Sequence, residues 1–341
     1  MKLVCEETSL LTSRMRSFRL MPVSDTDLLA ADTMPGEYFV FSFDDEGNNS
    51  LQRCYTLVSA EHGKFYEFII EDRGEGSASN VISRLLQERK EVNILGRGGE
   101  ITFNSVRSRK NVLLIAGGVG ITLPMALIRE CFKSYGYSAP GVVVQLVLSC
   151  HDLGSVPCLN ELMDLHTRCD WFSMRINVTR VKLAKFSDIV RAGRIDLAFD
   201  YIKAVPESAI VCGGADFAQS MVTAINTKFP QTSVAVEAFS SGRSFDYIMK
   251  SETHKTEITL KTLNRVISVD PGLTVLDNLI SHNVSIRNMC RSGICGSCKF
   301  RLHSGDIRSE PDFCLSAKDK AEKVYLACCS YPSENAVIDI I

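Results

Sequence analysis

The stretch Asn288-Met289-Cys290-Arg291-Ser292-Gly293-Ile294-Cys295-Gly296-Ser297-Cys298 decides the architecture of the C-terminal part of this chain. Its three cysteines follow a C-x4-C-x2-C pattern, and a gap of 29 residues separates the last of them from Cys328. This spacing is typical of the four thiolate ligands of a [2Fe–2S] cluster. Gly293 and Gly296 allow the loop to turn sharply and bring backbone N–H groups close to the sulfur atoms. The stretch therefore predicts an iron–sulfur site.

Two other interpretations of these cysteines stay open. Structural zinc sites also use C-x2-C, but they usually show two short ligand pairs a dozen or more residues apart, not three thiols in one short loop. The other interpretation is a set of buried thiols without a ligand. Cys328 has a cysteine neighbour, Cys329, and the gap selects Cys328 as the ligand, so that Cys329 is predicted to be a packed thiol. Cys314 fits no ligand position and is expected in a loop.

The composition is that of an ordinary globular protein. The chain has 341 residues, 45% of them hydrophobic and 23% charged, which is enough for two or three domains. A net charge of −2 gives no support to nucleic-acid binding. The sequence shows neither an apolar run of the roughly 18 residues that a membrane helix needs nor a signal peptide. Thirteen cysteines, of which four are spaced for iron, fit a reducing cytoplasm better than a disulfide scaffold.

Residues 1–105 read mainly as short strands separated by turns. Strands are expected at 17–21, 38–43, 55–58 and 65–70, with a turn at 44–49. Strands of this length and spacing predict a small antiparallel β-barrel. One helix is expected at 79–89, because the apolar residues there fall on one helical face.

Two polar features of this barrel can bind an anionic cofactor. Arg53, Tyr55 and Thr56 place a guanidinium, a phenol and a hydroxyl on one strand, with the first two on the same face. They can hold a flavin phosphate and contact its ribityl chain and ring, although such a strand is more often a solvated edge. The loop 73–79, with Gly76 and Ser77, leads into the expected helix and offers free N–H groups and hydroxyls to an anion. A plain capped loop is the alternative.

Residues 106–238 show the pattern of a nucleotide-binding α/β domain with a parallel sheet. The apolar run 111–116 is followed by Gly117-Gly118-Val119-Gly120-Ile121-Thr122 and then by a helix. The specific G-x-G-x-x-G fingerprint is absent. Further strands, each followed by a turn and a helix, are expected at 142–148, 172–178 and 209–212. Cys212 ends the last strand at the edge where ligands bind in such folds, although most cysteines at strand ends are merely buried.

The remaining sequence divides into a linker and a last domain. Residues 239–255 are polar and weakly patterned, which is typical of an interdomain linker. In residues 256–341 a hairpin is expected at 257–260 and 266–269, followed by a helix over 275–280. The cysteine loop follows this helix directly.

The order of these parts resembles the phthalate dioxygenase reductase family, the reductase components of two-component Rieske oxygenases. The resemblance rests on the Arg-x-Tyr-Thr strand, the Gly-Gly-Val-Gly-Ile-Thr turn, the Cys-Gly strand end and a C-terminal plant-type ferredoxin, and it covers nearly the whole chain. It implies a multidomain fold: an antiparallel β-barrel flavin domain, an α/β parallel-sheet nucleotide domain and a β-grasp ferredoxin domain. It also implies FMN, NADH and a [2Fe–2S] cluster as cofactors.

Carried over residue by residue, the resemblance implies three sets of site residues. The flavin contacts would be Arg53, Tyr55, Thr56, Gly76 and Ser77. The nicotinamide contacts would be Gly118, Gly120, Thr122 and Cys212. Such proteins also have a Glu-x-Phe pair beside the flavin, here Glu237 and Phe239. The metal ligands would be Cys290, Cys295, Cys298 and Cys328.

The chain departs from the family pattern at three places. Leu123 intervenes before Pro124 in the glycine turn, and Gly214 replaces the usual proline after Cys-Gly. Where the family pattern has Ser-Arg after the second sheet strand, this chain has Ser149-Cys150-His151-Asp152. Without that arginine a 2′-phosphate lacks its natural partner, and Asp152 would repel it. We therefore expect NADH rather than NADPH.

The predicted function follows from the electron chemistry of the implied cofactors. NADH releases two electrons together and a [2Fe–2S] cluster accepts one at a time, whereas a flavin can do both and must stand between them. The expected protein is a reductase that passes electrons to a separate Rieske-type oxygenase, without a catalytic side chain of its own. Exposed charges near the cysteine loop, at Arg291, Lys299 and Arg301, could steer that partner. The alternatives are an electron carrier or redox sensor that does not oxidise NADH, a zinc-binding structural protein, and FAD in place of FMN.

Overall fold

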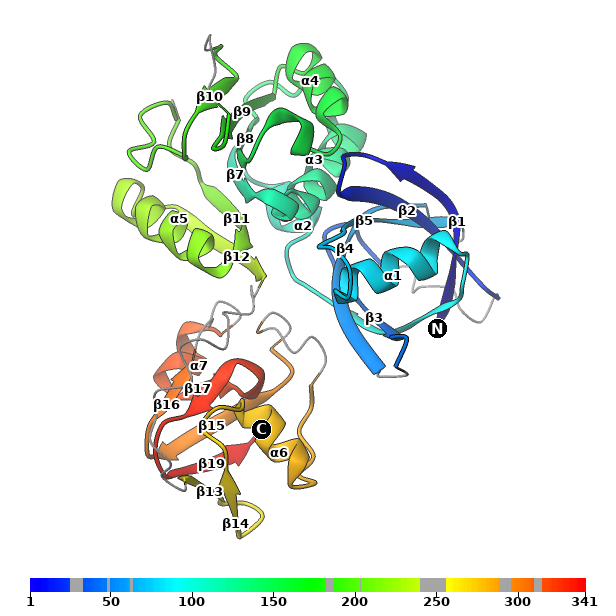
Figure 1. Ribbon diagram of the computed structural model, residues 1–341. Coiled ribbons are helices and arrows are strands. Elements are labelled where there is room, and N and C mark those ends of the chain that lie inside the picture. The colour runs from blue at the N-terminus through cyan, green and yellow to red at the C-terminus, as the bar shows by residue number, and fades with distance from the viewer. Residues whose placement is uncertain are drawn as a thin grey trace. The chain divides into compact units, whose positions relative to one another are not determined.

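A computed structural model describes residues 1–24, 33–47, 50–61, 64–181, 187–202, 204–239, 256–288, 293, 296–309 and 315–341. The chain divides into two units, Met1–Glu237 and Ala238–Ile341, and each is described by itself. Figure 1 shows their elements with the labels used below. In the described part of the chain, no helix has both the length and the apolar character needed to cross a membrane.

The first part of unit 1 is a closed β-barrel with strand order β1-β2-β5-β4-β3-β6. Its strands are β1 (Lys2–Leu10), β2 (Met15–Pro22), β3 (Tyr38–Asp44), β4 (Ser50–Glu61), β5 (Phe65–Glu71) and β6 (Val92–Gly98). All of its strand pairs are antiparallel. The predicted antiparallel barrel and its four expected strands are thereby confirmed, and β4 is longer at both ends than expected.

The barrel core is filled by aromatic and aliphatic side chains that alternate with outward-facing ones. Phe41 makes edge-to-face contacts with Phe68 and Tyr55, at centroid distances of 5.0 and 5.3 Å. The predicted helix is present as α1 (Ala78–Gln87), and its apolar face joins the same core through Ile82 and Leu86. A short helix, α2 (Phe103–Val106), follows the last barrel strand.

The second part of unit 1 is a six-stranded sheet with strand order β10-β9-β8-β7-β11-β12. Its strands are β7 (Asn111–Gly117), β8 (Val143–Cys150), β9 (Phe172–Val178), β10 (Val190–Ala192), β11 (Ser208–Gly214) and β12 (Ser233–Phe239). The helical elements are η2 (Gly118–Ile121), α3 (Thr122–Tyr135), η3 (Leu153–Ser155), α4 (Leu159–Arg168) and α5 (Ala215–Lys228). The pairs among β7 to β11 are parallel, which confirms the predicted sheet class.

Two features of this sheet differ from the expectation. The strand 172–178 was expected to lead into a helix, but the described residues after β9 form the short strand β10 and turns instead. The segment Ser233–Phe239 forms an edge strand that was not predicted. Pro124 lies in the first turn of α3, where the missing N–H of a proline leaves no helical hydrogen bond unmade.

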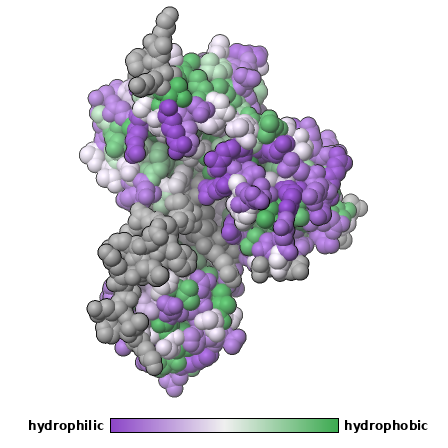
Figure 2. Space-filling model, in the orientation of Figure 1, coloured by the Kyte–Doolittle hydropathy of each residue, from purple (hydrophilic) through white to green (hydrophobic). Residues whose placement is uncertain are grey.

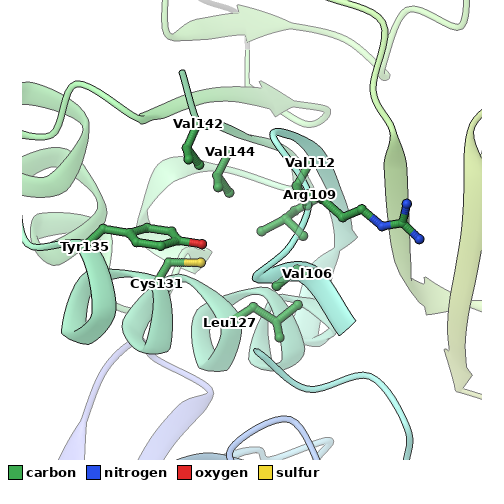
Figure 3. A pocket seen from close by; sticks show the side chains of 9 residues that line it. Val106, Arg109, Val112, Leu127, Cys131, Tyr135, Val142 and Val144 are labelled. Carbon is green, nitrogen blue, oxygen red and sulfur yellow. The ribbon is translucent and has the colours of Figure 1, made fainter. Parts of the chain in front are cut away.

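A small cavity lies between α3 and strands β7 and β8. Its volume is about 10 Å³ and its lining is mostly apolar, which is space for one water molecule at most. Figure 3 shows the Cys131 sulfur and the Tyr135 hydroxyl directed into it, while the guanidinium of Arg109 points away. Burial raises the pKa of the Cys131 thiol to about 12. The cavity is therefore a packing defect with a protonated, inert thiol rather than a binding site.

Unit 2 contains a five-stranded sheet of order β14-β13-β19-β15-β17 and a two-stranded sheet of β16 and β18. Its strands are β13 (Thr256–Leu260), β14 (Arg265–Val269), β15 (Lys299–Ser304), β16 (Ile307–Ser309), β17 (Val324–Leu326), β18 (Ser330–Pro332) and β19 (Ala336–Ile340). Its helices are α6 (Val275–Ser281), α7 (Ala317–Ala321) and η5 (Ala327–Cys329). The predicted hairpin and helix are confirmed as β13, β14 and α6.

The surface is mixed in polarity. Figure 2 shows hydrophobic side chains in small groups among hydrophilic ones on the face in view. The predicted linker 239–255 and Cys314 lie outside the described residues, except for the backbone of Phe239 at the end of β12.

Candidate cofactor-binding site

Four predicted site residues meet where strand β4 of the barrel contacts the nucleotide-binding sheet. The Thr56 hydroxyl donates a hydrogen bond to Glu237 Oε1 at 3.0 Å, and the Thr122 hydroxyl donates to Thr56 Oγ1 at 3.4 Å. Cys212 lies close enough to Glu237 for its thiol to be influenced by that charge. All four side chains are at most 6% exposed. Residues far apart in the sequence are thus brought together at one buried point.

Burial dominates the electrostatics of this point. It raises the pKa of Glu237 to about 7, although the hydrogen bond from Thr56 acts in the opposite direction. Burial also raises the pKa of Cys212 well above its usual value, and the charge of Glu237 adds to this, while the backbone N–H of Leu123 partly offsets it. Cys212 is therefore a neutral thiol at physiological pH, and a neutral thiol is a weak nucleophile.

The predicted flavin contacts Arg53 and Tyr55 have a further charged neighbour, Arg73, which lies outside their strand. The phenol of Tyr55 is influenced by the positive charges of both Arg53 and Arg73, and burial still raises its pKa above the usual range. Arg73 precedes the glycine loop and also lies 3.7 Å from Glu71. Arginine at the start of a glycine-rich loop is the sequence signal that could have added Arg73 to the predicted set.

The loop between β5 and α1 has the geometry of an open anion cradle. Gly74 and Gly76 have positive φ angles of 100° and 75°, and a Cβ at either position would meet no atom within 4 Å. Ser77 is the N-cap of α1 and accepts from the backbone N–H of Asn80 at 3.1 Å. Asp72 accepts from the backbone N–H of Gly74 at 2.8 Å, and this hydrogen bond holds the start of the loop in place. The loop thus leaves backbone groups accessible at a helix N-terminus, where an anion is favoured.

The glycines of the β7–α3 turn have two different roles. Gly118 has a φ of 56° and open space around its Cα, and it lines a cleft. A Cβ at Gly120 would lie 2.3 Å from the carbonyl oxygen of Cys212. Gly120 therefore allows the turn to pack directly on strand β11, while Gly118 faces the space where a ligand can bind.

That cleft has a volume of about 720 Å³ and runs along the carboxyl ends of the parallel strands. Its lining includes residues that follow β7, β8, β9, β10 and β11, together with Met15 and Glu71 of the barrel. In open α/β sheets, ligands bind outside the carboxyl ends of the strands where the strand order reverses. Here the order reverses beside β7, because β8 lies on one side of it and β11 on the other. The cleft has the position and the size to hold a dinucleotide.

Phe217 is among the cleft residues that were not predicted from the sequence. Phe217, in the first turn of α5, packs against the backbones of Gly117 and Gly213, where an added Cβ would lie 3.2 and 2.7 Å from its ring. Phe217 also lines the cleft and provides an aromatic surface at the ends of β7 and β11. The only sequence signal for Phe217 is the glycine at the end of each apolar strand, because a glycine there leaves room for a large side chain to pack on the backbone.

The structure places Asp152 differently from the role implied for it. Its carboxylate accepts from the backbone N–H of Ser155 at 2.9 Å in a capping box at the start of η3. Its neighbours His151 and Ser155 line the cleft. Asp152 therefore orders the loop after β8, and its predicted effect on a 2′-phosphate stays a prediction.

In unit 2, two of the four predicted cluster ligands are described. Cys298 and Cys328 are both buried, and the backbone N–H of Gly293 points at Cys328 Sγ from 3.2 Å. Such N–H donors stabilise thiolates and are typical around iron–sulfur clusters. Gly293 and Gly296 have positive φ angles of 74° and 65°, as the tight loop requires. Cys290 and Cys295 lie outside the described residues.

Cys329 is packed within the protein. It is buried, and its thiol donates to the carbonyl of Leu326 at 3.8 Å. The adjacent Cys328 instead receives the N–H of Gly293. This difference supports Cys328 as the ligand and agrees with the prediction that Cys329 is a packed thiol.

Comparisons with known proteins match separate parts of the chain to two domain families. Residues 258–333 match the 2Fe-2S iron-sulfur cluster binding domain, and residues 109–192 match the ferric reductase NAD binding domain. The chain is 25% identical to the glycine betaine monooxygenase reductase subunit of Pseudomonas aeruginosa, covering 89% of this chain and 86% of the relative. It is also 25% identical to the reductase subunit of the toluene-4-sulfonate monooxygenase system of Comamonas testosteroni, covering 82% and 81%.

A solved structure of phthalate dioxygenase reductase matches over 100% of this chain and 98% of its own, with a TM-score of 0.66 and 17% sequence identity. The two matched domains and the reductase subunits among the relatives define an NAD(P)H-dependent oxidoreductase that transfers electrons and carries a [2Fe–2S] domain. The chain shares the fold of phthalate dioxygenase reductase.

Proposed function

We propose that this protein is the reductase component of an oxygenase system, in which reduced nicotinamide dinucleotide supplies electrons that leave through the [2Fe–2S] domain. The observation that carries the proposal is the hydrogen-bonded contact of Thr56 with Glu237 and Thr122. It joins the strand predicted to hold the flavin to the strand ends predicted to hold the dinucleotide. A bound flavin would accept two electrons as hydride and release them singly, which links a two-electron donor to a one-electron acceptor.

We assign the flavin to the barrel and favour FMN over FAD. The loop with Gly76 and Ser77 would bind its phosphate, and Arg53 would add a charge-assisted contact. Tyr55 presents a partly buried, neutral phenol for the ring or ribityl chain. Thr56 would complete the surface of the barrel that contacts the flavin.

The nicotinamide would lie over the ends of β7 and β11. Gly118 lets the dinucleotide approach the backbone closely, and Cys212 and Glu237 form a buried wall with no ionised thiol. Gly120 and Thr122 would support the site without contacting the dinucleotide. Gly120 allows the turn to pack on β11, and Thr122 donates a hydrogen bond to Thr56. These residues would position the nicotinamide and exclude water, and they would not take part in a covalent step. Phe239, adjoining Glu237 in the strand, is proposed as a flavin neighbour.

The domain boundaries that suit this function are 1–105 for the flavin barrel, 106–238 for the nucleotide domain, 239–255 for a linker and 256–341 for the ferredoxin domain. Cys290, Cys295, Cys298 and Cys328 would hold the cluster. The electrons would then pass to a separate oxygenase of the Rieske type, in the reducing cytoplasm. The relatives that are reductase subunits of monooxygenase systems support a separate oxygenase as partner.

The test is a visible spectrum of the anaerobically purified protein, recorded before and after one equivalent of NADH or NADPH. We expect flavin bands with a broad iron–sulfur shoulder that bleach within seconds, together with dinucleotide-dependent reduction of cytochrome c. Bleaching by dithionite but by neither dinucleotide would identify a carrier or redox sensor instead. A colourless protein that contains zinc would contradict the assignment of the cysteines.

A further inference from the structure

Two arginines stand at the end of the cleft away from the barrel contact. Arg180 lies two residues after the end of β9 and Arg194 two residues after the end of β10, and both line the cleft. Within the described ranges, neither guanidinium has an ion-pair or side-chain hydrogen-bond partner. The acidic residues in the same lining, Glu71 and Asp216, come from the barrel and from the start of α5. The charge of the cleft is therefore divided between its two ends.

The sheet order decides which part of a dinucleotide reaches these arginines. The nicotinamide must reach the barrel, and the residues that contact the barrel strand β4 are Thr122, after β7, and Glu237, on β12. Strand β9 lies on the other side of β7, two places away. At a strand spacing of about 4.8 Å, its end is roughly 10 Å from the end of β7. The adenosine half of the dinucleotide then lies over the ends of β8, β9 and β10.

The loop after β8 brings further polar groups to the same end. The backbone N–H of Arg180 donates to the carbonyl of His151 at 3.0 Å, so the two residues are neighbours across the strand ends. His151 also lines the cleft, whereas the carboxylate of Asp152 is held by Ser155. In dinucleotide-binding sheets, an acidic residue here accepts the ribose 2′-hydroxyl, and an arginine accommodates a 2′-phosphate. The residues that face the cleft at this end are cationic or neutral.

We propose that Arg180 and Arg194 form a subsite for the 2′-phosphate of NADPH, so that the protein uses NADPH at least as well as NADH. This inference rests on the proposed binding of a dinucleotide in the cleft. It replaces the preference for NADH that the sequence pattern around Asp152 suggested. Each guanidinium can donate two N–H groups to a phosphate, which lysine or histidine alone cannot match.

The experiment compares two adenosine probes and two reductants on the cofactor-loaded full-length protein. Calorimetric titration should show adenosine 2′,5′-bisphosphate binding about tenfold or more tightly than adenosine 5′-monophosphate, since a charge-assisted contact is worth at least that factor. The kcat/KM ratio of NADPH to NADH should be one or more. Arg180→Gln and Arg194→Gln should each lower both ratios by about tenfold.

Arg191→Gln is the matched control, because Arg191 belongs to β10, pairs with Asp188 at 3.8 Å and does not line the cleft. It should leave both ratios unchanged. Equal binding of the two probes, together with reduction by NADH at least tenfold better than by NADPH, would overturn the subsite and leave the proposed function intact. Tighter binding of the bisphosphate that is lost in Arg180→Gln, without reduction by either dinucleotide, would support the subsite and refute the reductase.

Discussion

Replacing Arg129 by methionine should loosen the contact between the barrel and the nucleotide-binding sheet. Arg129, on α3, makes two hydrogen bonds to the carboxylate of Glu161 at 2.7 and 2.8 Å and one to Glu67 on barrel strand β5 at 3.1 Å. The other oxygen of Glu67 accepts from the Ser17 hydroxyl at 2.6 Å. Burial alone would lower the pKa of Arg129, but its bond to Glu161 and the charges of both glutamates raise it above the usual range.

The expected loss of stability is about 3 kcal/mol. Breaking a buried ion pair on one side costs roughly 3–5 kcal/mol, because the remaining charge stays buried without its partner. The side chain of Glu67 is 10% exposed and fits this case, whereas that of Glu161 is 36% exposed and can be solvated in the variant. Its share is therefore closer to the 0–1 kcal/mol of a surface pair.

Denaturant unfolding measures this loss conveniently. The chain has a single tryptophan, Trp171, which is buried next to β9 and reports on the nucleotide-binding sheet. Its fluorescence should show a lower midpoint for Arg129→Met at an unchanged slope. The double variant Glu67→Gln/Arg129→Met should recover part of the difference, because no unpaired charge remains.

Lys228→Ala is the control, since Lys228 forms an exposed pair with Asp200 at 2.7 Å and should cost less than about 1 kcal/mol. If Arg129→Met costs no more than this control, or if the double variant is less stable than the single one, the buried pair does not hold the two parts together as we reason.

Three further predictions follow from the site. Glu237 has a folded-state pKa above its unfolded value, so the protein should lose stability as pH rises from about 4.5 to about 7, by some 3 kcal/mol; pH-dependent unfolding of Glu237→Gln should lack this slope. Gly120→Ala should lower the free energy of unfolding by more than about 2 kcal/mol because its Cβ would meet backbone, whereas Gly214→Ala, at a φ of −64° with open space around it, should change that energy by less than about 1 kcal/mol, as thermal unfolding would show. Cys328→Ser should lose bound iron on purification and Cys329→Ser should keep it, as iron analysis would show.

Local patterns were sufficient to predict the architecture. The continuous apolar run 111–116 could belong only to a strand buried on both faces, and a glycine turn after it indicated a parallel sheet. The barrel strands followed from short apolar segments bounded by turns. Strand β12 was not predicted, because the apolar residues of its sequence SVAVEAF do not alternate strictly with polar ones. Strand β10 has three residues, too few for any periodicity.

The site could be predicted only in part, because its remaining members depend on tertiary contacts. Thr56 and Cys212 were identified from their positions on strands, but their meeting with Glu237 is a long-range contact. Nothing local indicates that Glu71 of the barrel lines the cleft, or that Arg180 faces it. The Asp152 carboxylate also caps η3 by accepting from the backbone N–H of Ser155, and this local contact was not predicted; the effect of Asp152 on a 2′-phosphate stays a prediction.

Thr56 and Glu237, which are hydrogen-bonded in the folded protein, are synthesised at different times. The two residues are 181 positions apart. At a translation rate of roughly 5–20 residues per second, about 10–40 s pass between their appearance at the ribosome. The barrel can close on itself in that time, since its last strand ends at Gly98. The nascent chain can therefore present a finished barrel with the face around Thr56 still open to solvent, and the proposed flavin could enter before strand β12 is synthesised and covers it.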